Sequence, residues 1–352
     1  MNEAPLRQQP SRRQRFSALW RSARLVCLAA VLLFGLAALL SCQRQQHPPI
    51  RISLIDWPGF YPLYLAKSLG LYQQQGLEVE LILSPDNPRA NQLFETGGAD
   101  LLAGPYADFI TMQAEGVGLK VLTVFDYSKA DLLMAQPSIR SVADLRGKPV
   151  GIDRKNSFSH LFILLLLKKH GIPEEAANLR VIPFDQVPDA LSQGLIAAGH
   201  IWEPAAAEAA KRGFRVLADA GELPGAISDC LAVSDRMLRE RPEELQRLML
   251  AVVEAQRWFE QHPSEGLKQV AAFVKRPAAE LVPFLAAVNT ITPEQSLQAF
   301  NKGPGLTSLY GSGDVISRFL TDRGFTNIVP VETLLEPVFL QRALQDRRGG
   351  TP

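Results

Sequence analysis

Aromatic side chains and carboxylates gather in a few short segments of this 352-residue chain, each following a strand-like stretch. Aromatic faces around a small number of fixed polar groups are typical of a site for a small molecule. Acids in such a site accept hydrogen bonds from nitrogen donors and repel inorganic anions such as nitrate, which favours an organic solute that carries a nitrogen. The candidate binding residues are Trp57, Phe60, Tyr61, Asn87, Tyr106, Asp126, Tyr127, Ser128, Ser157, Phe158, Trp202, Glu203 and Asp229.

Alternating strand and helix patterns explain why these segments should meet. Short apolar stretches at residues 52–55, 77–83 and 101–103 alternate with helix-like segments, and the same plan restarts at residue 149. Units of this length predict an α/β fold with parallel-type sheets and helices on both faces. In such sheets ligands bind beyond the carboxyl ends of the strands, where the candidate residues lie.

The restart of the plan predicts two lobes. Ile55-Asp56 ends the first strand of one half, and Ile152-Asp153 ends the first strand of the other. We expect one lobe to comprise residues 50–135 and 229–345, including a helical C-terminal tail, and the other residues 136–228. The hinges are expected near residues 132–136 and 229–233.

The first 49 residues have the pattern of an export signal followed by a tether. An Arg-rich segment precedes an uninterrupted apolar run at residues 25–40, which is shorter than the ~20 residues that span a bilayer. The run ends in LLSC at residues 39–42, which resembles a bacterial lipobox and predicts a signal peptide over residues 1–41 and lipidation of Cys42. An uncleaved anchor helix is the alternative, and both place the body outside the cytoplasm. Residues 42–49 form a polar tether, and residues 346–352 are expected to be a disordered tail.

Charge and cysteine content narrow the function further. The chain has 37 Lys and Arg against 36 Asp and Glu, and six Arg and one Glu fall within residues 1–41, which leaves 31 and 35, or −4. A mildly acidic body with scattered charges indicates no nucleic-acid partner. After cleavage the body keeps Cys42 and one further cysteine, Cys230, whose apolar neighbours favour a core position. We expect a monomer.

A family resemblance rests on three runs of sequence: DWPGFYPLYLA at residues 56–66, DLRGKPVG at residues 144–151 and WEP at residues 202–204. Together they resemble the nitrate/sulfonate/taurine binding-protein family, which also includes binders of thiamine-pyrimidine precursors. The resemblance implies a two-lobed periplasmic-binding-protein (flytrap) fold without a cofactor or metal. It also implies a solute receptor with an ABC permease and ATPase as partners, and together with the lipobox this predicts a lipid-anchored protein at the periplasmic side of the cell envelope. Ala197, where many relatives carry Asp, and His200, unusual before the Trp, depart from the family pattern.

Other functions and ligands stay open at this point. The sequence carries no metal-ligand spacing, nucleophile elbow, P-loop or dinucleotide fingerprint, so no catalytic residue is expected. A sensory flytrap that docks to a membrane receptor is an alternative to the importer. Lys129, Arg154 and Lys155 could meet a sulfonate or carboxylate, and the helix that begins at Asn156-Ser157 could receive an anionic group.

Overall fold

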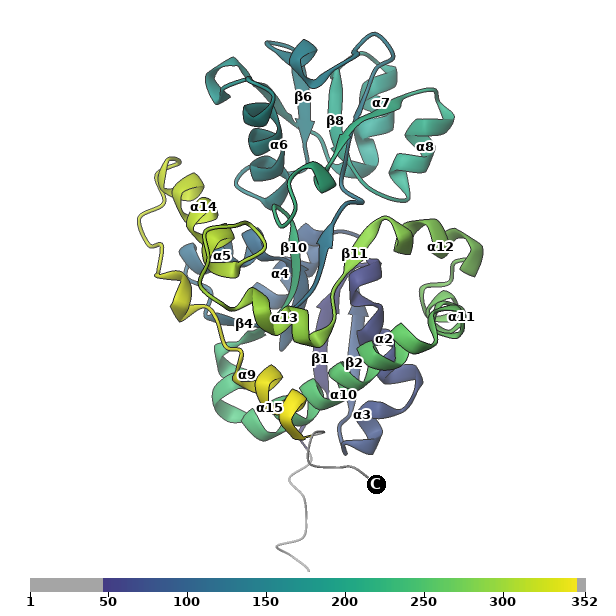
Figure 1. Ribbon diagram of the computed structural model, residues 1–352, viewed down its shortest axis with the longest axis vertical. Coiled ribbons are helices and arrows are strands. Elements are labelled where there is room, and N and C mark those ends of the chain that lie inside the picture. The colour runs from purple at the N-terminus through teal and green to yellow at the C-terminus, as the bar shows by residue number, and fades with distance from the viewer. Residues whose placement is uncertain (1–46, 347–352) are drawn as a thin grey trace, which may run out of the picture. The chain divides into compact units, whose positions relative to one another are not determined.

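The structure is a computed structural model that describes residues 47–346 (Figure 1). All of these residues from Pro49 onward fall in one compact unit. The predicted signal peptide, Cys42 and the predicted tail from residue 347 lie outside the described residues. Within residues 47–346, no helix combines the length and the apolar character that a bilayer crossing requires.

The first sheet has six strands in the order β2-β1-β3-β10-β4-β11. β1 runs parallel to β2 and β3, whereas β10 is antiparallel to β3 and β4, and β11 is antiparallel to β4. The strands are β1 (Ile50–Leu54), β2 (Val79–Leu83), β3 (Leu101–Pro105), β4 (Leu119–Ser128), β10 (Ser228–Ser234) and β11 (Val288–Thr290).

The second sheet repeats this order with five strands, β7-β6-β8-β5-β9. β6 is parallel to β7 and β8, and β5 is antiparallel to β8 and β9. The repeated plan predicted from the sequence is therefore confirmed, but each sheet is mixed rather than parallel throughout. The strands are β5 (Leu132–Ala135), β6 (Pro149–Ile152), β7 (Asn178–Val181), β8 (Ala198–Ile201) and β9 (Arg215–Asp219).

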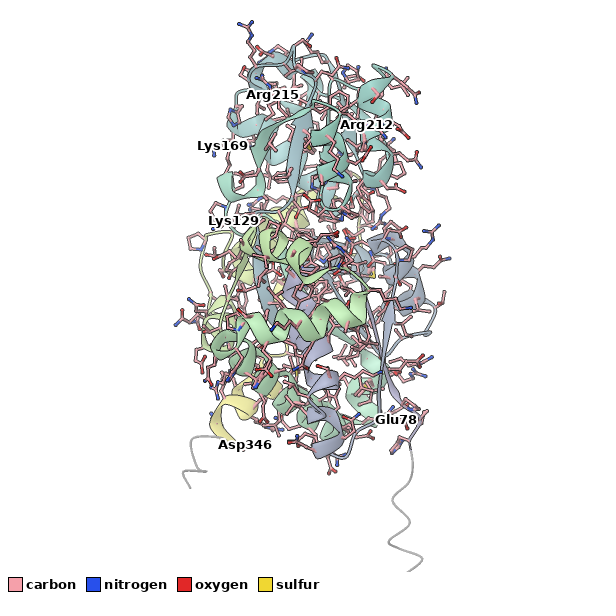
Figure 2. The ribbon with its side chains drawn as sticks, turned by 90° about the vertical axis from the view of Figure 1, so that its right-hand side faces the viewer. Glu78, Lys129, Lys169, Arg212, Arg215 and Asp346 are labelled. Atoms are coloured by element: carbon pink, nitrogen blue, oxygen red, sulfur yellow. The ribbon has the colours of Figure 1, made fainter. Side chains whose placement is uncertain are left out.

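The mixed directions follow from how the chain crosses between the sheets. β5 follows β4 after residues 129–131, and β10 follows β9 after residues 220–227. Each connection enters the next sheet at the edge where its parallel strands end, so each crossing strand runs antiparallel to its neighbours. The sequence had assigned residues 132–135 to the first lobe and hinges to residues 132–136 and 229–233. These segments lie mostly within β5 and β10, because the connections come just before the strands. Figure 2 labels Lys129 on the first connection, between the two sheets.

Helices cover both sheets, and each sheet with its helices is called a lobe from here on (Figure 1). The apolar block of residues 161–167 lies in α6 of the second lobe, most of whose residues are buried. The second lobe has α6 (Phe158–Lys169), α7 (Val187–Ser192) and α8 (Ala205–Lys211). The first lobe has α2 (Tyr61–Ser68), α3 (Leu71–Gln74), α4 (Asn87–Glu95), α5 (Tyr106–Ala114), α9 (Asp235–Glu240), α10 (Pro242–Gln261), α11 (Pro263–Val274), α12 (Ala278–Ala286), α13 (Pro293–Ala299), α14 (Leu309–Thr321) and α15 (Val338–Asp346).

The C-terminal tail is mostly helical, as predicted, and three of its prolines begin helices, whereas Pro283 lies inside α12. Pro242, Pro263 and Pro293 each occupy the first position of a helix, where the missing N–H would have no helical partner. The long helix α10 packs on α2 and α15.

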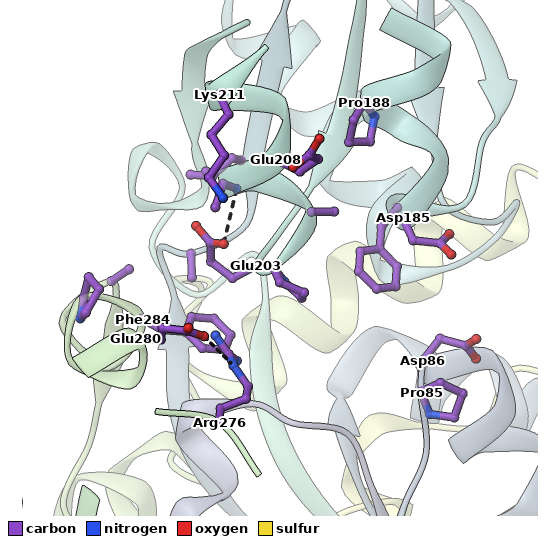
Figure 3. A pocket seen from close by; sticks show the side chains of 18 of the residues that line it. Pro85, Asp86, Asp185, Pro188, Glu203, Glu208, Lys211, Arg276, Glu280 and Phe284 are labelled. Carbon is purple, nitrogen blue, oxygen red and sulfur yellow. Dashed lines mark hydrogen bonds and ion pairs between the residues drawn. The ribbon is translucent and has the colours of Figure 1, made fainter. Parts of the chain in front are cut away.

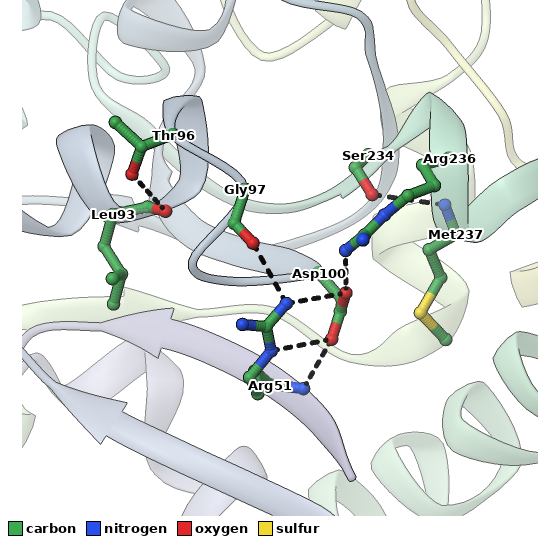
Figure 4. Close-up of polar contacts among 8 residues, drawn as sticks. All are labelled: Arg51, Leu93, Thr96, Gly97, Asp100, Ser234, Arg236 and Met237. Atoms are coloured by element: carbon green, nitrogen blue, oxygen red, sulfur yellow. Dashed lines mark hydrogen bonds and ion pairs between the residues drawn. The ribbon is translucent and has the colours of Figure 1, made fainter. Parts of the chain in front are cut away.

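A buried acid ties the first strand of the first lobe to the start of this tail (Figure 4). Asp100, 5% exposed, accepts hydrogen bonds from the backbone and side chain of Arg51 on β1. Its Oδ1 also accepts from Arg236 Nη2 on α9 at 2.7 Å. One carboxylate thus binds two guanidinium groups at the edge of the sheet away from the candidate residues.

Candidate functional site

An inner pocket lies where the carboxyl ends of β1, β3 and β8 meet the start of β10. Both lobes and both connections contribute to it, and its free volume of about 10 Å³ corresponds to about one water molecule. Five of the candidate residues named from the sequence line it. Its walls are Ile55, Trp57, Asn87, Pro105, Asp131, Phe158, Trp202, Ile227 and Asp229.

Two ring pairs, one from each lobe, connect the walls of this pocket to a second cavity. Trp57 meets Phe284 of α12 edge to face, with ring centroids 5.5 Å apart. Trp202 stacks on Phe184 at 4.2 Å. Phe284 and Phe184 line the second cavity, so these ring pairs join a wall of the inner pocket to a wall of this outer cavity.

The outer cavity has a volume of about 910 Å³ and opens between α12 of the first lobe and α7 and α8 of the second. Figure 3 shows Glu203 between Lys211 of the second lobe and Arg276 of the first. Arg276 is held by Asp56 at 2.8 Å, and Arg212 is held by Asp189 at 2.5 Å. These two guanidinium groups therefore already have anionic partners.

Two carboxyl groups stand side by side at the floor of the site. Asp126 on β4 and Asp229 on β10 are direct cross-strand partners, and their side chains are 0% and 4% exposed. The indole Nε1 of Trp57 donates to Asp126 Oδ2 at 3.2 Å. Gly59 makes room for this contact, because a Cβ at that position would lie 1.7 Å from the same oxygen.

Burial raises the pKa of both acids. For Asp126 desolvation raises the pKa to about 8, against which the hydrogen bonds from Trp57 and with Asp229 act. For Asp229 desolvation comes first and the adjacent charge of Asp126 second, and its pKa is well above the usual range of an aspartate. Two ionised carboxylates in contact inside a protein repel each other, so the pair favours a protonated state.

Two acceptor oxygens of the inner pocket have no hydrogen-bond partner. They are Asp229 Oδ2 and Asn87 Oδ1, and each residue is 4% exposed. A buried acceptor without a donor is unfavourable by roughly 1–3 kcal/mol. Both oxygens line a pocket with aromatic walls, so the arrangement suits a ligand that brings N–H donors.

His200 lies beneath the aromatic wall of the second lobe in a closed hydrogen-bond chain. Its Nε2 contacts Asp131 Oδ1 at 2.9 Å and its Nδ1 contacts Ser159 Oγ at 2.7 Å. Ser159 Oγ in turn accepts from the backbone N–H of Asp153. His200 and Ser159 are both fully buried, so this Ser-His-Asp order links β8, α6 and the first connection and offers no exposed nucleophile.

The start of α6, where the sequence suggested an anionic ligand, is occupied by an acid of the chain itself. Asp108 of α5 accepts from the backbone N–H of Phe158 at 2.9 Å and from Arg154 Nη2 at 3.1 Å. The same carboxylate accepts from Asn91 Nδ2. It is 1% exposed, so an anionic group of a ligand meets a filled position here.

The remaining candidate residues lie outside the inner pocket. Phe60 packs on Phe125 and Tyr61 on Tyr64, within the core of the first lobe. Tyr127 Oη donates to the carbonyl of Thr307, and Ser128 bonds Asp131. Three others are Tyr106, which is buried at the start of α5, Ser157, whose Oγ donates to the Arg154 carbonyl, and Glu203, which lines the outer cavity.

Sequence reasoning missed part of the site. Asp131 falls in a segment that the strand-end rule selects, but it was not singled out among its neighbours. Phe284 and Arg276 come from the C-terminal tail, which the sequence predicted to be helical, so the strand-end rule did not select them. Among the described residues no cluster of His, Cys, Asp and Glu has the geometry of a metal site.

Solved structures with the same fold define the class of protein. The alkanesulfonate-binding protein SsuA of Xanthomonas axonopodis pv. citri, solved with MOPS bound, matches with a TM-score of 0.66 and 21% identity over 82% of this chain and 98% of its own. The ligand-binding component of an ABC-type import system of Staphylococcus aureus matches with a TM-score of 0.67 and 16% identity over 84% and 99%. The desulfurization enzyme DSZB also has this fold, with a TM-score of 0.60 and 17% identity over 86% and 100%. The chain therefore has the two-lobed periplasmic-binding-protein fold.

Sequence comparison then gives the family. The NMT1/THI5 like family matches residues 57–266, more than half of the chain, and the chain belongs to this family. YtlA of Bacillus subtilis (strain 168), named as a candidate binding protein, is 23% identical over 70% of this chain and 77% of its own. A Brucella abortus (strain 2308) protein named in the same way is 24% identical over 77% and 86%. The predicted membership in the family of ABC-type solute-binding proteins is confirmed.

Proposed function

We propose that the protein captures a small, nitrogen-bearing organic solute outside the cytoplasm and delivers it to an ABC permease. One observation carries the choice of solute: Asp229 Oδ2 and Asn87 Oδ1, both buried and without a donor, line one aromatic-walled pocket. A ligand nitrogen that carries hydrogens satisfies both oxygens, and the flanking rings favour a cationic or heteroaromatic group.

The charges around the site argue against a bare inorganic anion. Asp126 and Asp229 at the floor repel an anion, and the guanidinium of Arg154 is already paired with Asp108. An anion would also leave the two acceptor oxygens of the inner pocket without donors. The free volume of the inner pocket admits only a small group, so we assign it to the nitrogen-bearing end of the solute and the outer cavity to the remainder.

We further propose that the two lobes close on the solute about residues 129–131 and 220–227. Hinge closure is the usual motion of two-lobed binders, and both connections cross at the inner pocket, which contains Asp131 and Ile227. Small-angle scattering should give a smaller radius of gyration with a saturating ligand than without it. Identical profiles under saturation would contradict closure.

The protein is proposed to be held at the envelope through Cys42. The apolar run that ends in Ser41-Cys42 motivates this assignment. Cys42→Ala should move the protein from the membrane fraction to the soluble fraction or leave the unprocessed precursor. Cys230→Ala is the matched control, since the Cys230 thiol is buried in the first lobe. Membrane association and mass unchanged by Cys42→Ala would contradict the lipid anchor.

The binding function itself is tested by a thermal-shift screen of residues 43–352 against amines, amidines, aminopyrimidines, sulfonates and nitrate. A ligand that binds only the folded protein raises its melting temperature by mass action. We expect the nitrogen-bearing cations and aminopyrimidines to raise the melting temperature and nitrate to leave it unchanged. Stabilisation by nitrate alone would contradict an organic solute, and no stabilisation by any class would contradict the binding site.

A further inference from the structure

The carboxyl pair at the floor of the site has an environment unlike that of any other acid described above. Asp126 and Asp229 face each other across β4 and β10 and lie within hydrogen-bonding reach. Asp126 Oδ1 and Asp229 Oδ2 have no partner. The neighbouring strands add no charge, since Pro105 of β3 pairs with Asp229, and Thr290 of β11 pairs with Asp126.

The titratable groups around the pair are acidic or neutral. Asp131 of the first connection and Asp108 of α5 act on it as further negative charges, and the Cys230 thiol lies beside it on β10. Within residues 47–346 no ion pair joins either carboxyl of the pair to a lysine, arginine or histidine. Asp131 contacts His200 Nε2, and Asp108 is paired with Arg154, so the side chains beside these two acids already have acidic partners other than the pair.

Two negative charges in contact and out of water repel each other strongly, and a single proton held between them relieves most of this repulsion. The empty site therefore has a pair with a net charge of −1. A cation that enters the inner pocket supplies the missing positive charge from outside the chain. Once it is bound, its charge offsets the repulsion between the two carboxylates in place of the proton, and the site keeps the net charge of −1 that it had when empty.

We propose that Asp126 and Asp229 share one proton in the empty protein and release it to solvent when an N–H-bearing cation, of the ammonium or amidinium class, binds Asp229 and Asn87. This inference rests on the proposed function, since it names the solute class of the same pocket. The balance is simple: the pair passes from −1 to −2, the cation adds +1, and one proton leaves to the buffer. No bond other than the O–H bond of the carboxyl pair is broken.

The two acceptor oxygens of the inner pocket define the class of ligand more narrowly than charge alone does. Both orphan groups are acceptors, so a quaternary ammonium, which has no N–H, leaves them without donors. The rings of Trp57, Phe158 and Trp202 suit the flat face of an amidinium or the methylene beside an ammonium. Benzamidine has these features and an apolar tail for the outer cavity. Benzamide is its neutral isostere, and benzenesulfonate is an anion with the same ring.

Calorimetric titration of residues 43–352 with these three probes tests the inference. Benzamidine should bind at least tenfold more tightly than benzamide at pH 8, and benzenesulfonate should bind more weakly than both. The observed enthalpy of benzamidine binding should differ between phosphate and Tris buffers, because the released proton protonates the buffer. Affinity for benzamidine should rise with pH between about 6 and 8, by at most about tenfold per pH unit, the limit for one proton. Equal enthalpies in the two buffers and a flat pH profile would overturn proton release.

Two variants separate the roles of the acids. Asp229→Asn should weaken benzamidine binding by roughly tenfold to a hundredfold, because it neutralises the acceptor in the pocket. Asp126→Asn should keep most of the affinity and reduce the buffer-dependent enthalpy, since Asp229 then ionises without a charged neighbour. Melting curves check that both variants fold. Tighter binding of benzenesulfonate than of benzamidine would contradict a cationic solute but not the proposed binding function. If no probe here or in the wider screen stabilises the protein, both the cationic solute and the binding function are contradicted.

Discussion

The two lobes share one strand order but differ at equivalent positions of their cleft edges. In the first sheet, Asp229 at the start of the crossing strand β10 faces Asp126 of β4. In the second sheet, Leu132 at the start of the crossing strand β5 faces Asp219 of β9. Asp219 is half-buried, and its Oδ1 accepts from the backbone N–H of Gly221 at 2.8 Å. The same topology thus holds an unsatisfied acid pair in one lobe and a leucine beside a satisfied acid in the other.

The buried polar groups of the two lobes therefore have different roles: those of one lobe support the structure, and those of the other recognise the solute. The polar group under the cleft in the second lobe is His200, and both of its ring nitrogens have partners. A fully satisfied buried network fixes a structure and has no need of a ligand. In the first lobe, Asp229 and Asn87 keep unpartnered oxygens, so that lobe is expected to select the solute while the second lobe covers it.

The largest effect is expected from breaking the network of the second lobe. His200→Leu leaves the buried Asp131 carboxylate without its imidazole partner and should lower the free energy of unfolding by roughly 3–5 kcal/mol. Urea denaturation measures this change in the free energy of unfolding. The matched control is His262→Leu, since His262 is exposed and should give a change of less than about 1 kcal/mol. Equal effects of the two substitutions would show that the His200 chain does not support the lobe.

The next effect is a difference in how the stability of the protein depends on pH when Asp126 or its equivalent in the second lobe, Asp219, is replaced. The folded pKa of Asp126 lies above its ordinary value of 3.8, so the folded state binds more protons and stability falls as pH rises from about 4 to about 8. Asp126→Asn removes this loss and should raise the free energy of unfolding by roughly 2–4 kcal/mol at pH 8, and by much less at pH 4.

Asp219→Asn is the control in the second lobe. Asp219 is half-buried and serves as a local cap, so its loss should lower stability by at most about 1 kcal/mol. Melting curves of both variants from pH 4 to pH 8 make the comparison. A decrease in stability at pH 8 for Asp126→Asn would show that the pair is not strained by its charge.

A smaller effect is expected from the two tryptophans of the inner pocket. Trp57→Phe removes the indole N–H that holds Asp126 and should weaken benzamidine binding by about 1–2 kcal/mol. Trp202→Phe removes ring area only and should weaken it by less than about 1 kcal/mol. Titration calorimetry of both variants is the measurement. A larger loss for Trp202→Phe would assign recognition to the second lobe instead.

The smallest effects are expected at the outer cavity. Arg276→Ala removes a half-buried ion pair with Asp56 and a contact over the Phe284 ring, and should lower the free energy of unfolding by about 1 kcal/mol. Arg212→Ala, on the opposite wall, removes solvent-exposed ion pairs and should leave the melting temperature unchanged. A larger loss of stability in Arg212→Ala than in Arg276→Ala would show that α12 of the first lobe contributes little to closing the cavity.

Much of this architecture was readable from local sequence signals. The alternation of apolar strands and helices predicted two α/β lobes and a helical tail, because hydrophobic periodicity reflects which face of each element is buried. The strand-end rule selected Trp57, Asn87, Phe158, Trp202 and Asp229, all of which line the inner pocket. The same rule also selected Phe60 and Tyr61, since it cannot tell a ring that faces the cleft from one that turns into the core.

Other features depend on contacts between distant segments and were decided only by the tertiary structure. The pairing of Asp126 with Asp229 follows from the register of β4 against β10, which a single sequence does not specify. The Asp108 carboxylate at the start of α6 and the Phe284 ring against Trp57 likewise join segments far apart in the chain. The sequence by itself determined which residues could do chemistry here, because residue type and local periodicity are properties of short segments. Which of them lost water and met another charge was decided by packing, because desolvation and charge proximity exist only once the lobes have folded together.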